Sequence, residues 1–333
     1  MNRVAIAGAD LEFDCSSAET LLRSGLRAGL GMPYECSIGT CGECKFEVLE
    51  GEFECEAGPH FAGLSDRDVA RGRMLACQAR PKTDCTVRLR LEDRFVPIIP
   101  PAYHNATLVS VEAIAPEMMF CRFQSDEPAS FRAGQYARLL LGEMQAWRAY
   151  SMCDLPNDRG HWDFLIRPVA GGLASEALFS AGAIGQSYLI DAPYGNAWHR
   201  SGARRIMCIA GGAGLAPTLS IARAAAHDPA CEAIDFLYGG RTPVDLCAAA
   251  LLDQAARPAL RIDCHDVVSG EASGWAGARG LLHDYLDATF PQIEADVDCY
   301  VAGPPPMVDA VVDVLVDKKN VAADRIYFDR FFG

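Results

Sequence analysis

The spacing of apolar and polar residues changes along the chain and predicts three regions of different architecture. Within residues 1–96, alternation at Lys45–Glu50 and Thr86–Glu92 predicts strands, and Leu21–Leu30 has the spacing of a short amphipathic helix. Residues 97–102 contain three prolines, which exclude a helix or a central strand and predict an extended linker.

The second and third regions differ from the first in rhythm. Residues 103–200 contain short β runs separated by turn residues, such as Tyr136–Leu141 and Trp162–Arg167, which predicts an antiparallel sandwich or barrel. Residues 201–333 repeat a strand, a glycine turn and a helix, which is typical of a parallel sheet. We therefore expect a multidomain protein with α+β, β and α/β parts.

Composition and charge exclude several classes of protein. Half of the 333 residues are hydrophobic, which excludes intrinsic disorder. The net charge of −14 argues against nucleic acid or an anionic membrane as a partner. The longest apolar run, Ile206–Ala222, is interrupted by glycines and a proline, so we expect no membrane span. No signal-peptide pattern follows Met1, and we expect a cytoplasmic protein.

The fourteen cysteines include one group with a diagnostic spacing. A long chain without a signal peptide does not suit a disulfide scaffold. Cys36, Cys41 and Cys44 are spaced C-x4-C-x2-C, and with the later Cys77 they match the ligands of a plant-type [2Fe–2S] cluster. The weaker alternatives are four incidental thiols and a zinc site, which would favour two C-x2-C pairs. For the other ten cysteines, small buried residues or free thiols are the better interpretation.

The segment from Pro33 to Phe46 resembles the ferredoxin-like domains that are fused to flavoprotein reductases. This resemblance implies a β-grasp fold for residues 1–96.

A second motif lies in the β-rich region. In Arg148-Ala149-Tyr150-Ser151, the arginine can pair with a pyrophosphate, the tyrosine can lie against a flat ring and the hydroxyl can bond a ring nitrogen. Alone, the motif is equally compatible with an ordinary strand. Together with neighbouring glycine and arginine segments, it resembles the flavin domain of the ferredoxin–NADP reductase superfamily. The resemblance implies an FAD-binding antiparallel β-barrel whose cofactor contacts are Arg148, Ala149, Tyr150, Ser151, Arg167, Val169, Gly172 and Ser175.

Glycine turns in the last region carry a third motif. The turn Gly211–Pro217 connects a buried strand, Arg205–Ala210, to a helix expected at Thr218–His227, an arrangement that can receive a phosphate or serve only as a turn. The run Ala302–Met307 resembles the nicotinamide loop of the same superfamily, with alanine in place of its cysteine. The resemblance implies a Rossmann-like NAD-binding sheet whose contacts include Gly212, Ala213, Gly214, Gly303 and Pro304.

The nucleotide preference follows from the charges after the strand Ala233–Tyr238. Arg241 is the only cation near the expected adenosine ribose, and Asp245 is close by, which favours NADH over NADPH. The alternative is that Arg241 stacks on adenine or pairs with Asp245.

The aromatic tail is the last candidate element of the site. The resemblance implies that Phe331 or Phe332 covers the flavin, with Asp329 nearby, and Ser151 completes the candidate catalytic set; the alternative is a strand that only docks.

These motifs together predict an electron-transfer enzyme. NADH gives up two electrons together and a [2Fe–2S] cluster accepts one, so FAD, which can do both, must stand between them. The chain resembles the reductase components of multicomponent aromatic-ring oxygenases, especially those of carbazole-type dioxygenases and toluene-type di-iron monooxygenases. The resemblance implies a monomer that reduces an oxygenase or its Rieske ferredoxin. Two alternatives remain: an acceptor such as a deoxysugar-pathway enzyme, and a passive ferredoxin carrier with non-catalytic appended domains. The run of glutamates between Glu43 and Glu56 is either a solvated face or a guide for a basic partner.

Overall fold

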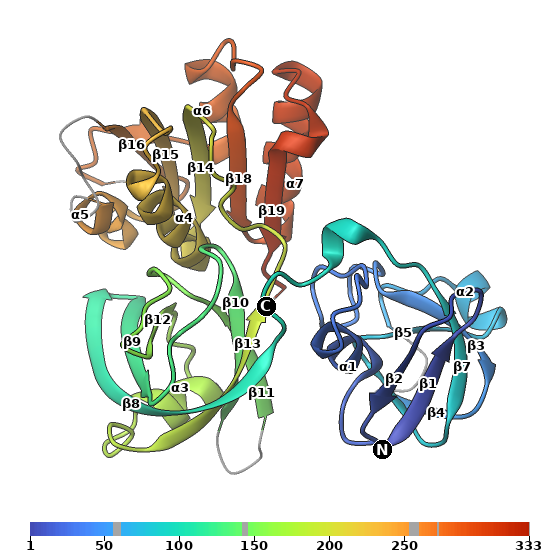
Figure 1. Cartoon of the computed structure of the whole chain (residues 1–333). Coiled ribbons are helices and arrows are strands. Elements are labelled where there is room, and N and C mark those ends of the chain that lie inside the picture. The colour runs from blue at the N-terminus through green and yellow to red at the C-terminus, as the bar shows by residue number, and fades with distance from the viewer. Residues whose placement is uncertain (56–60, 142–145, 253–259, 272, 333) are drawn as a thin grey trace. The chain divides into compact units, whose positions relative to one another are not determined.

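The computed structural model describes residues 1–55, 61–141, 146–252, 260–271 and 273–332. The chain divides into two compact units, Met1–Ala102 and Tyr103–Phe331; Figure 1 labels their helices and strands. Within the described ranges, no helix combines the length and the apolar character needed to cross a membrane.

The first unit has a five-stranded sheet in the order β2-β1-β7-β3-β5 and a small second sheet of β4 and β6. The pair β1–β7 is parallel, and the pairs β1–β2, β3–β7 and β3–β5 are antiparallel. This mixed sheet, with α1 packed against it, confirms the β-grasp fold. The elements are β1 (Asn2–Ile6), β2 (Glu12–Cys15), α1 (Leu21–Arg27), β3 (Lys45–Glu50), β4 (Phe53–Cys55), α2 (Asp66–Ala70), β5 (Arg73–Leu75), β6 (Ala79–Pro81), β7 (Cys85–Leu89) and η1 (Asp93–Phe95).

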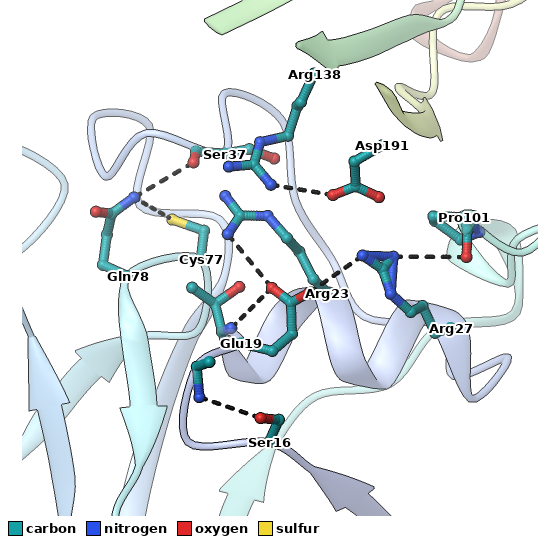
Figure 2. A network of polar contacts seen from close by, with 12 residues as sticks. Ser16, Glu19, Arg23, Arg27, Ser37, Cys77, Gln78, Pro101, Arg138 and Asp191 are labelled. Carbon is teal, nitrogen blue, oxygen red and sulfur yellow. Dashed lines mark hydrogen bonds and ion pairs between the residues drawn. The ribbon is translucent and has the colours of Figure 1, made fainter. Parts of the chain in front are cut away.

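The helix α1 is amphipathic, as the apolar spacing predicts, but it is shorter than predicted. Its leucines are buried, whereas Arg23 and Arg27 both reach Glu19, at 3.5 Å and 3.1 Å (Figure 2). The helix ends before Leu30 because Gly29 has a φ of +80°, a left-handed conformation that stops helices.

The second unit begins with a six-stranded sheet in the order β11-β10-β13-β8-β9-β12. An antiparallel bridge between Met152 and Phe164 joins the end of β11 to β12, so the two outer strands of this order meet and the sheet closes into a barrel. The elements are β8 (Ala102–Ala115), β9 (Met118–Ser125), β10 (Tyr136–Leu141), β11 (Ala146–Ser151), β12 (His161–Ile166), α3 (Leu173–Phe179) and β13 (Ser187–Tyr194).

The remainder of this unit is a parallel sheet in the order β17-β16-β15-β14-β18-β19, and every adjacent pair is parallel. The strands are β14 (Arg205–Gly211), β15 (Ala233–Gly240), β16 (Arg261–Val268), β17 (Ala278–Arg279), β18 (Asp298–Gly303) and β19 (Ile326–Arg330). The helices are α4 (Leu215–His227), α5 (Ala248–Leu252), α6 (Leu282–Thr289) and α7 (Pro305–Asp313), and the short helical turns are η2 (Gly212–Gly214), η3 (Pro243–Asp245), η5 (Val314–Lys318) and η6 (Ala323–Arg325).

Alternate residues of β14 point into two separate cores. Ile206 and Cys208 pack with residues of α4 and α5, whereas Met207 and Ile209 pack with residues of α6 and α7. Helices therefore cover both faces of the sheet, which confirms the Rossmann-like architecture and places the ligand crevice at the carboxyl ends of the strands.

The helix α4 begins at Leu215, three residues before the predicted start at Thr218. Pro217 falls within the first turn, where a missing backbone N–H breaks no helical hydrogen bond. The glycine turn is consequently shorter than the sequence predicts.

Candidate functional site

The four predicted cluster ligands lie in two pairs. The sulfurs of Cys36 and Cys41 are 3.3 Å apart, and the thiols of Cys44 and Cys77 are hydrogen-bonded to each other. Among the described residues, no three His, Cys, Asp or Glu side chains converge on one metal-ion position. Two thiol pairs fit a cluster with two irons better than a tetrahedral zinc ion.

The loop Cys36–Cys44, which we call the ligand loop, stabilises negative charge on the sulfur of Cys36. The backbone N–H groups of Thr40 and Cys41 donate to Cys36 Sγ at 3.4 Å and 3.3 Å. The hydrogen bond from the Cys41 thiol is the largest contribution that lowers the pKa of Cys36, to about 5, and the backbone donors add to it, while burial acts in the opposite direction. A thiolate is the form that binds iron, so the loop favours the ligand state.

Two glycines let this loop pack closely. Gly39 and Gly42 have φ angles of +89° and +79°. A Cβ atom at Gly42 would lie 2.6 Å from the carbonyl oxygen of Gly63, and one at Gly39 would lie 2.6 Å from the ring of Phe61. Side chains at either position would push the loop away from the segment that supports it.

One residue beside the ligands has no sequence signal. The Gln78 amide nitrogen lies 3.5 Å from Cys77 Sγ and 3.3 Å from the carbonyl oxygen of Ser37, as Figure 2 shows. It donates to a ligand sulfur and to the ligand loop together. Hydrogen bonds to ligand sulfurs are one of the factors that set a cluster's reduction potential.

The predicted flavin motif lies along β11. Its register places Ser151 opposite Tyr136 and Arg148 opposite Leu139. Because side chains alternate along a strand, Arg148 and Tyr150 share one face and Ser151 lies on the other. Arg148 is exposed and Ser151 is buried, while the Tyr150 ring packs 6.5 Å from Phe164. Burial raises the pKa of Tyr150 to about 12, so it stays neutral and can lie against a ring.

The glycine segment beyond β12 forms a turn closed by one hydroxyl. Ser175 Oγ accepts a hydrogen bond from the Val169 N–H at 2.7 Å, and Gly172 stands directly before α3. Gly171 has a φ of +68°. The hydroxyl oxygen of Ser175 therefore holds the turn, while its O–H remains able to donate to a ligand.

A buried ion pair supports the strands around the flavin motif. Arg138 on β10 contacts Asp191 on β13 at 3.1 Å (Figure 2), and Tyr194 donates to the same carboxylate at 2.9 Å. The Arg138 guanidinium also lies 4.5 Å from the ring centre of Trp147 on β11. One side chain thus connects three neighbouring strands.

A cavity of about 400 Å³ lies at the carboxyl ends of the parallel strands. It is lined by four of the residues predicted to bind the nucleotide: Gly212, Ala213, Arg241 and Pro304. Arg167, which the sequence groups with the flavin segment, also lines this cavity and pairs there with Glu117. Sequence reasoning missed Glu117, because only the tertiary fold brings this residue of the barrel to the parallel sheet.

Two glycines that are predicted to bind the nucleotide, Gly214 and Gly303, allow backbone segments near the cavity to pack closely. A Cβ atom at Gly214 would lie 2.0 Å from the carbonyl oxygen of Ala302 on β18, so the first turn of α4 and this strand touch through their backbones. Gly303 has a φ of +150°, and a Cβ atom there would lie 3.0 Å from the carbonyl oxygen of Gly211. Both glycines permit close packing between the two turns.

The carboxylate of Asp245 is held at the cavity wall. It accepts hydrogen bonds from the N–H groups of Arg241, at 3.1 Å, and Thr242, at 2.8 Å. The sequence-based alternative of an Arg241–Asp245 contact is therefore present, but through the backbone of Arg241.

The C-terminal tail is hydrogen-bonded to the predicted nicotinamide loop, Ala302–Met307. Asp329 pairs in register with Ala302, and the Phe331 N–H donates to the carbonyl oxygen of Gly303 at 2.9 Å. Asp329 is buried, whereas Phe331 and Phe332 are half-buried. Which phenylalanine covers a flavin stays a prediction.

Comparison with known proteins agrees with this three-part organisation. Residues 4–82 match a 2Fe-2S iron-sulfur cluster binding domain, residues 105–199 an oxidoreductase FAD-binding domain and residues 208–313 an oxidoreductase NAD-binding domain. The chain is 37% identical over 325 residues to the ferredoxin–NAD(P)(+) reductase CarAd of Metapseudomonas resinovorans, covering 96% of each chain. It is 36% identical over 323 residues to the ferredoxin–NAD(+) reductase component of the alkene monooxygenase system of Xanthobacter autotrophicus, covering 96% of this chain and 97% of the relative.

Solved structures with the same arrangement include a ferredoxin reductase in carbazole 1,9a-dioxygenase, with a TM-score of 0.89, 35% identity and coverage of 99% and 98% of the two chains. The Amycolatopsis cytochrome P450 reductase GcoB has a TM-score of 0.84, 30% identity and coverage of 99% of both chains. The protein is an NAD(P)H oxidoreductase with domains for FAD and a [2Fe–2S] cluster. It belongs to the family of ferredoxin reductases that serve as electron-transfer components of oxygenase systems.

Proposed function

We propose that this chain passes electrons from NADH through FAD and its [2Fe–2S] cluster to an oxygenase component or to the ferredoxin that serves one. The observation that carries the proposal is that one chain holds both two thiol pairs suited to a cluster and a nucleotide cavity lined by Gly212, Ala213, Arg241 and Pro304. When bound, FAD accepts a hydride and releases electrons singly, so it can connect a two-electron donor to a one-electron centre.

The residues of β11 and α3 would hold the flavin. Arg148 is exposed, and although its Nη1 donates to the Trp147 carbonyl oxygen at 2.9 Å, its remaining N–H groups would pair with the pyrophosphate, while Tyr150 on the same face would lie against the ring. Ser151 would direct its hydroxyl to a ring nitrogen from the buried end of the strand. The Gly172 N–H is bonded to the Val169 carbonyl oxygen at 2.9 Å, so Gly172 would hold the turn, while the Ser175 hydroxyl and the first N–H groups of α3 would donate to the phosphates.

The nucleotide cavity and the tail would bring the nicotinamide to the flavin. The hydrogen bond between the Phe331 N–H and the Gly303 carbonyl oxygen would keep the aromatic tail beside the nicotinamide loop. Either Phe331 or Phe332 would then cover the ring when the nucleotide is absent, with Asp329 beside it.

The cavity favours NADH over NADPH. The Asp245 carboxylate is held at the wall by the N–H groups of Arg241 and Thr242, and a 2′-phosphate placed beside it would meet like charge.

Since NADH turns over inside cells, we place the protein in the cytoplasm and expect a monomer that visits a larger partner.

A cytochrome P450 is a second candidate acceptor. The observation that favours it is the likeness of the whole chain to the P450 reductase GcoB. Under either candidate the same cofactors carry the electrons, and only the docking partner differs.

The test uses the purified holoprotein with NADH and two artificial acceptors. Ferricyanide can take electrons from the flavin, whereas under this proposal cytochrome c takes them from the cluster. A Cys41→Ser variant should keep ferricyanide reduction and lose cytochrome c reduction, because one iron loses a thiolate ligand. A Cys121→Ser variant is the matched control, since this buried thiol lies in the barrel. Failure of NADH to bleach the flavin, or unchanged cytochrome c reduction in Cys41→Ser, would refute the proposed path.

A further inference from the structure

A groove of about 640 Å³ in the first unit lies directly against the cluster-binding loop. Its wall includes Gly42, Glu43 and Cys44, so it borders one of the predicted ligands. The rest of its charged lining comes from the strands β3, β5 and β7 and from the segment after β7: Lys45, Glu47, Arg73, Arg88, Arg90, Glu92 and Arg94. We call it the arginine groove.

The arginine groove is positive on a strongly acidic protein. Among the described residues, five basic and three acidic side chains line it, whereas the whole chain carries −14. Asp68, which lies behind the lining, contacts both Lys45 and Arg73, at 3.0 Å and 2.9 Å. Even with Asp68 counted, one positive charge is in excess.

The outermost cations of the groove share a single carboxylate. Arg90 and Arg94 contact the two oxygens of Glu92 at 3.0 Å and 2.9 Å, and their side chains are 76% and 72% exposed. One carboxylate cannot neutralise two guanidinium groups, and exposed side chains can turn toward a new partner at little cost. An incoming carboxylate would therefore find two donors at the rim.

Two of the glutamates that follow the ligand loop pair with cations of later strands or turns. Glu47 pairs with Arg88 at 2.7 Å across the β3–β7 ladder, and Glu54 contacts Lys82 at 3.5 Å. Glu56 lies outside the described residues. Basic side chains from later in the chain thus offset two glutamates of the acidic run.

We propose that the arginine groove is the docking site of the electron-acceptor protein, and that the acceptor presents a carboxylate-rich surface to it. This rests on the proposed function, which requires a one-electron acceptor to approach the cluster. The groove satisfies that requirement because Cys44 forms part of its wall, and electron transfer falls steeply with distance. Charge complementarity at the exposed rim would steer the partner and raise its rate of association.

The test compares protein acceptors of opposite charge. The variant Arg90→Glu/Arg94→Glu is assayed with NADH and an acidic Rieske-type ferredoxin, whose potential is high enough for NADH to reduce it, and separately with the cationic cytochrome c. We expect kcat/KM for the ferredoxin to fall about tenfold or more at low ionic strength, and kcat/KM for cytochrome c to stay or rise. High salt should shrink the difference, because the charges at the rim are exposed.

The matched control is Arg204→Glu/Arg261→Glu, which changes the net charge equally. These arginines are 68% and 61% exposed, each in a surface ion pair, at the amino ends of the parallel strands. We expect less than about a twofold effect on either acceptor. The neutral variant Arg90→Gln/Arg94→Gln should lose ferredoxin activity in the same direction but less, which guards against misfolding of the reversed variant.

The outcomes separate the two proposals. A wild-type protein that reduces ferricyanide but neither protein acceptor would refute the proposed function. Three results would overturn the docking site alone, provided that the wild type reduces both acceptors. They are an unchanged kcat/KM for the ferredoxin in the Arg90 and Arg94 variants, an equal fall in the control variant, and an equal fall with cytochrome c.

Discussion

Replacing Gln78 by leucine should lower the reduction potential of the [2Fe–2S] cluster. The Gln78 amide donates to Cys77 Sγ at 3.5 Å, and the reduced cluster carries more negative charge on its sulfurs than the oxidised one. The hydrogen bond therefore stabilises the reduced form preferentially. Leucine keeps a similar volume and removes the donor.

The size of the effect follows from the strength of one such contact. A hydrogen bond contributes about 1 kcal/mol net. For one electron, a tenfold change in the equilibrium is about 59 mV, so 1 kcal/mol corresponds to about 40 mV. The same amide also donates to the Ser37 carbonyl at 3.3 Å, so part of its effect is to hold the ligand loop. We expect a fall of about 20–60 mV.

The assay is a redox titration of the purified holoprotein followed by the low-temperature EPR signal of the reduced cluster. Asn2→Ala is the matched control, because the Asn2 amide donates at 2.8 Å to the carbonyl oxygen of Pro81 in the same unit. The cluster of the control variant should have the same reduction potential as that of the wild type. A Gln78→Leu protein with a full EPR signal and an unshifted or raised potential would refute the reasoning.

Three further predictions concern the second unit. Gly214→Ala should destabilise the protein in urea by about 1–3 kcal/mol, since its Cβ would lie 2.0 Å from the Ala302 carbonyl oxygen; unchanged stability would contradict the close contact. Asp245→Asn should raise the NADPH/NADH ratio of kcat/KM about tenfold, whereas an unchanged ratio would remove Asp245 from nucleotide choice. Asp191→Ala should cost about 3–5 kcal/mol in the same urea assay, because it leaves Arg138 buried without this carboxylate; a loss below about 1 kcal/mol would show that the pair is dispensable.

The alternation of apolar and polar residues correctly predicts the strands whose bounds depend on nearby residues alone. The strands at Lys45–Glu50 and Tyr136–Leu141 have the predicted bounds, because alternation and flanking turns define them. The predicted ends of the helices are less accurate. The left-handed conformation of Gly29 ends α1 early, and α4 begins early because its first turn accommodates Pro217. The domain limits at 96 and 102 stay predictions, although the chain divides into its two compact units after Ala102.

In the candidate site too, the sequence predicts residues that lie close together in the chain but not those that only the fold brings together. Cys36, Cys41 and Cys44 share one short loop, so their spacing alone indicates a cluster. The contribution of Glu117 to the nucleotide cavity arises from tertiary packing and leaves no spacing to read. The pairing of Glu47 with Arg88 likewise joins residues far apart in the chain, so the sequence alone does not show that this glutamate is paired.

The most direct test of the electron path is anaerobic reduction by NADH followed by EPR. We expect NADH to bleach the flavin and to generate the signal of a reduced [2Fe–2S] cluster, with an intensity close to that produced by dithionite. A flavin that is bleached by NADH beside a cluster that only dithionite can reduce would contradict the path from NADH through FAD to the cluster that we expect Cys36, Cys41, Cys44 and Cys77 to hold.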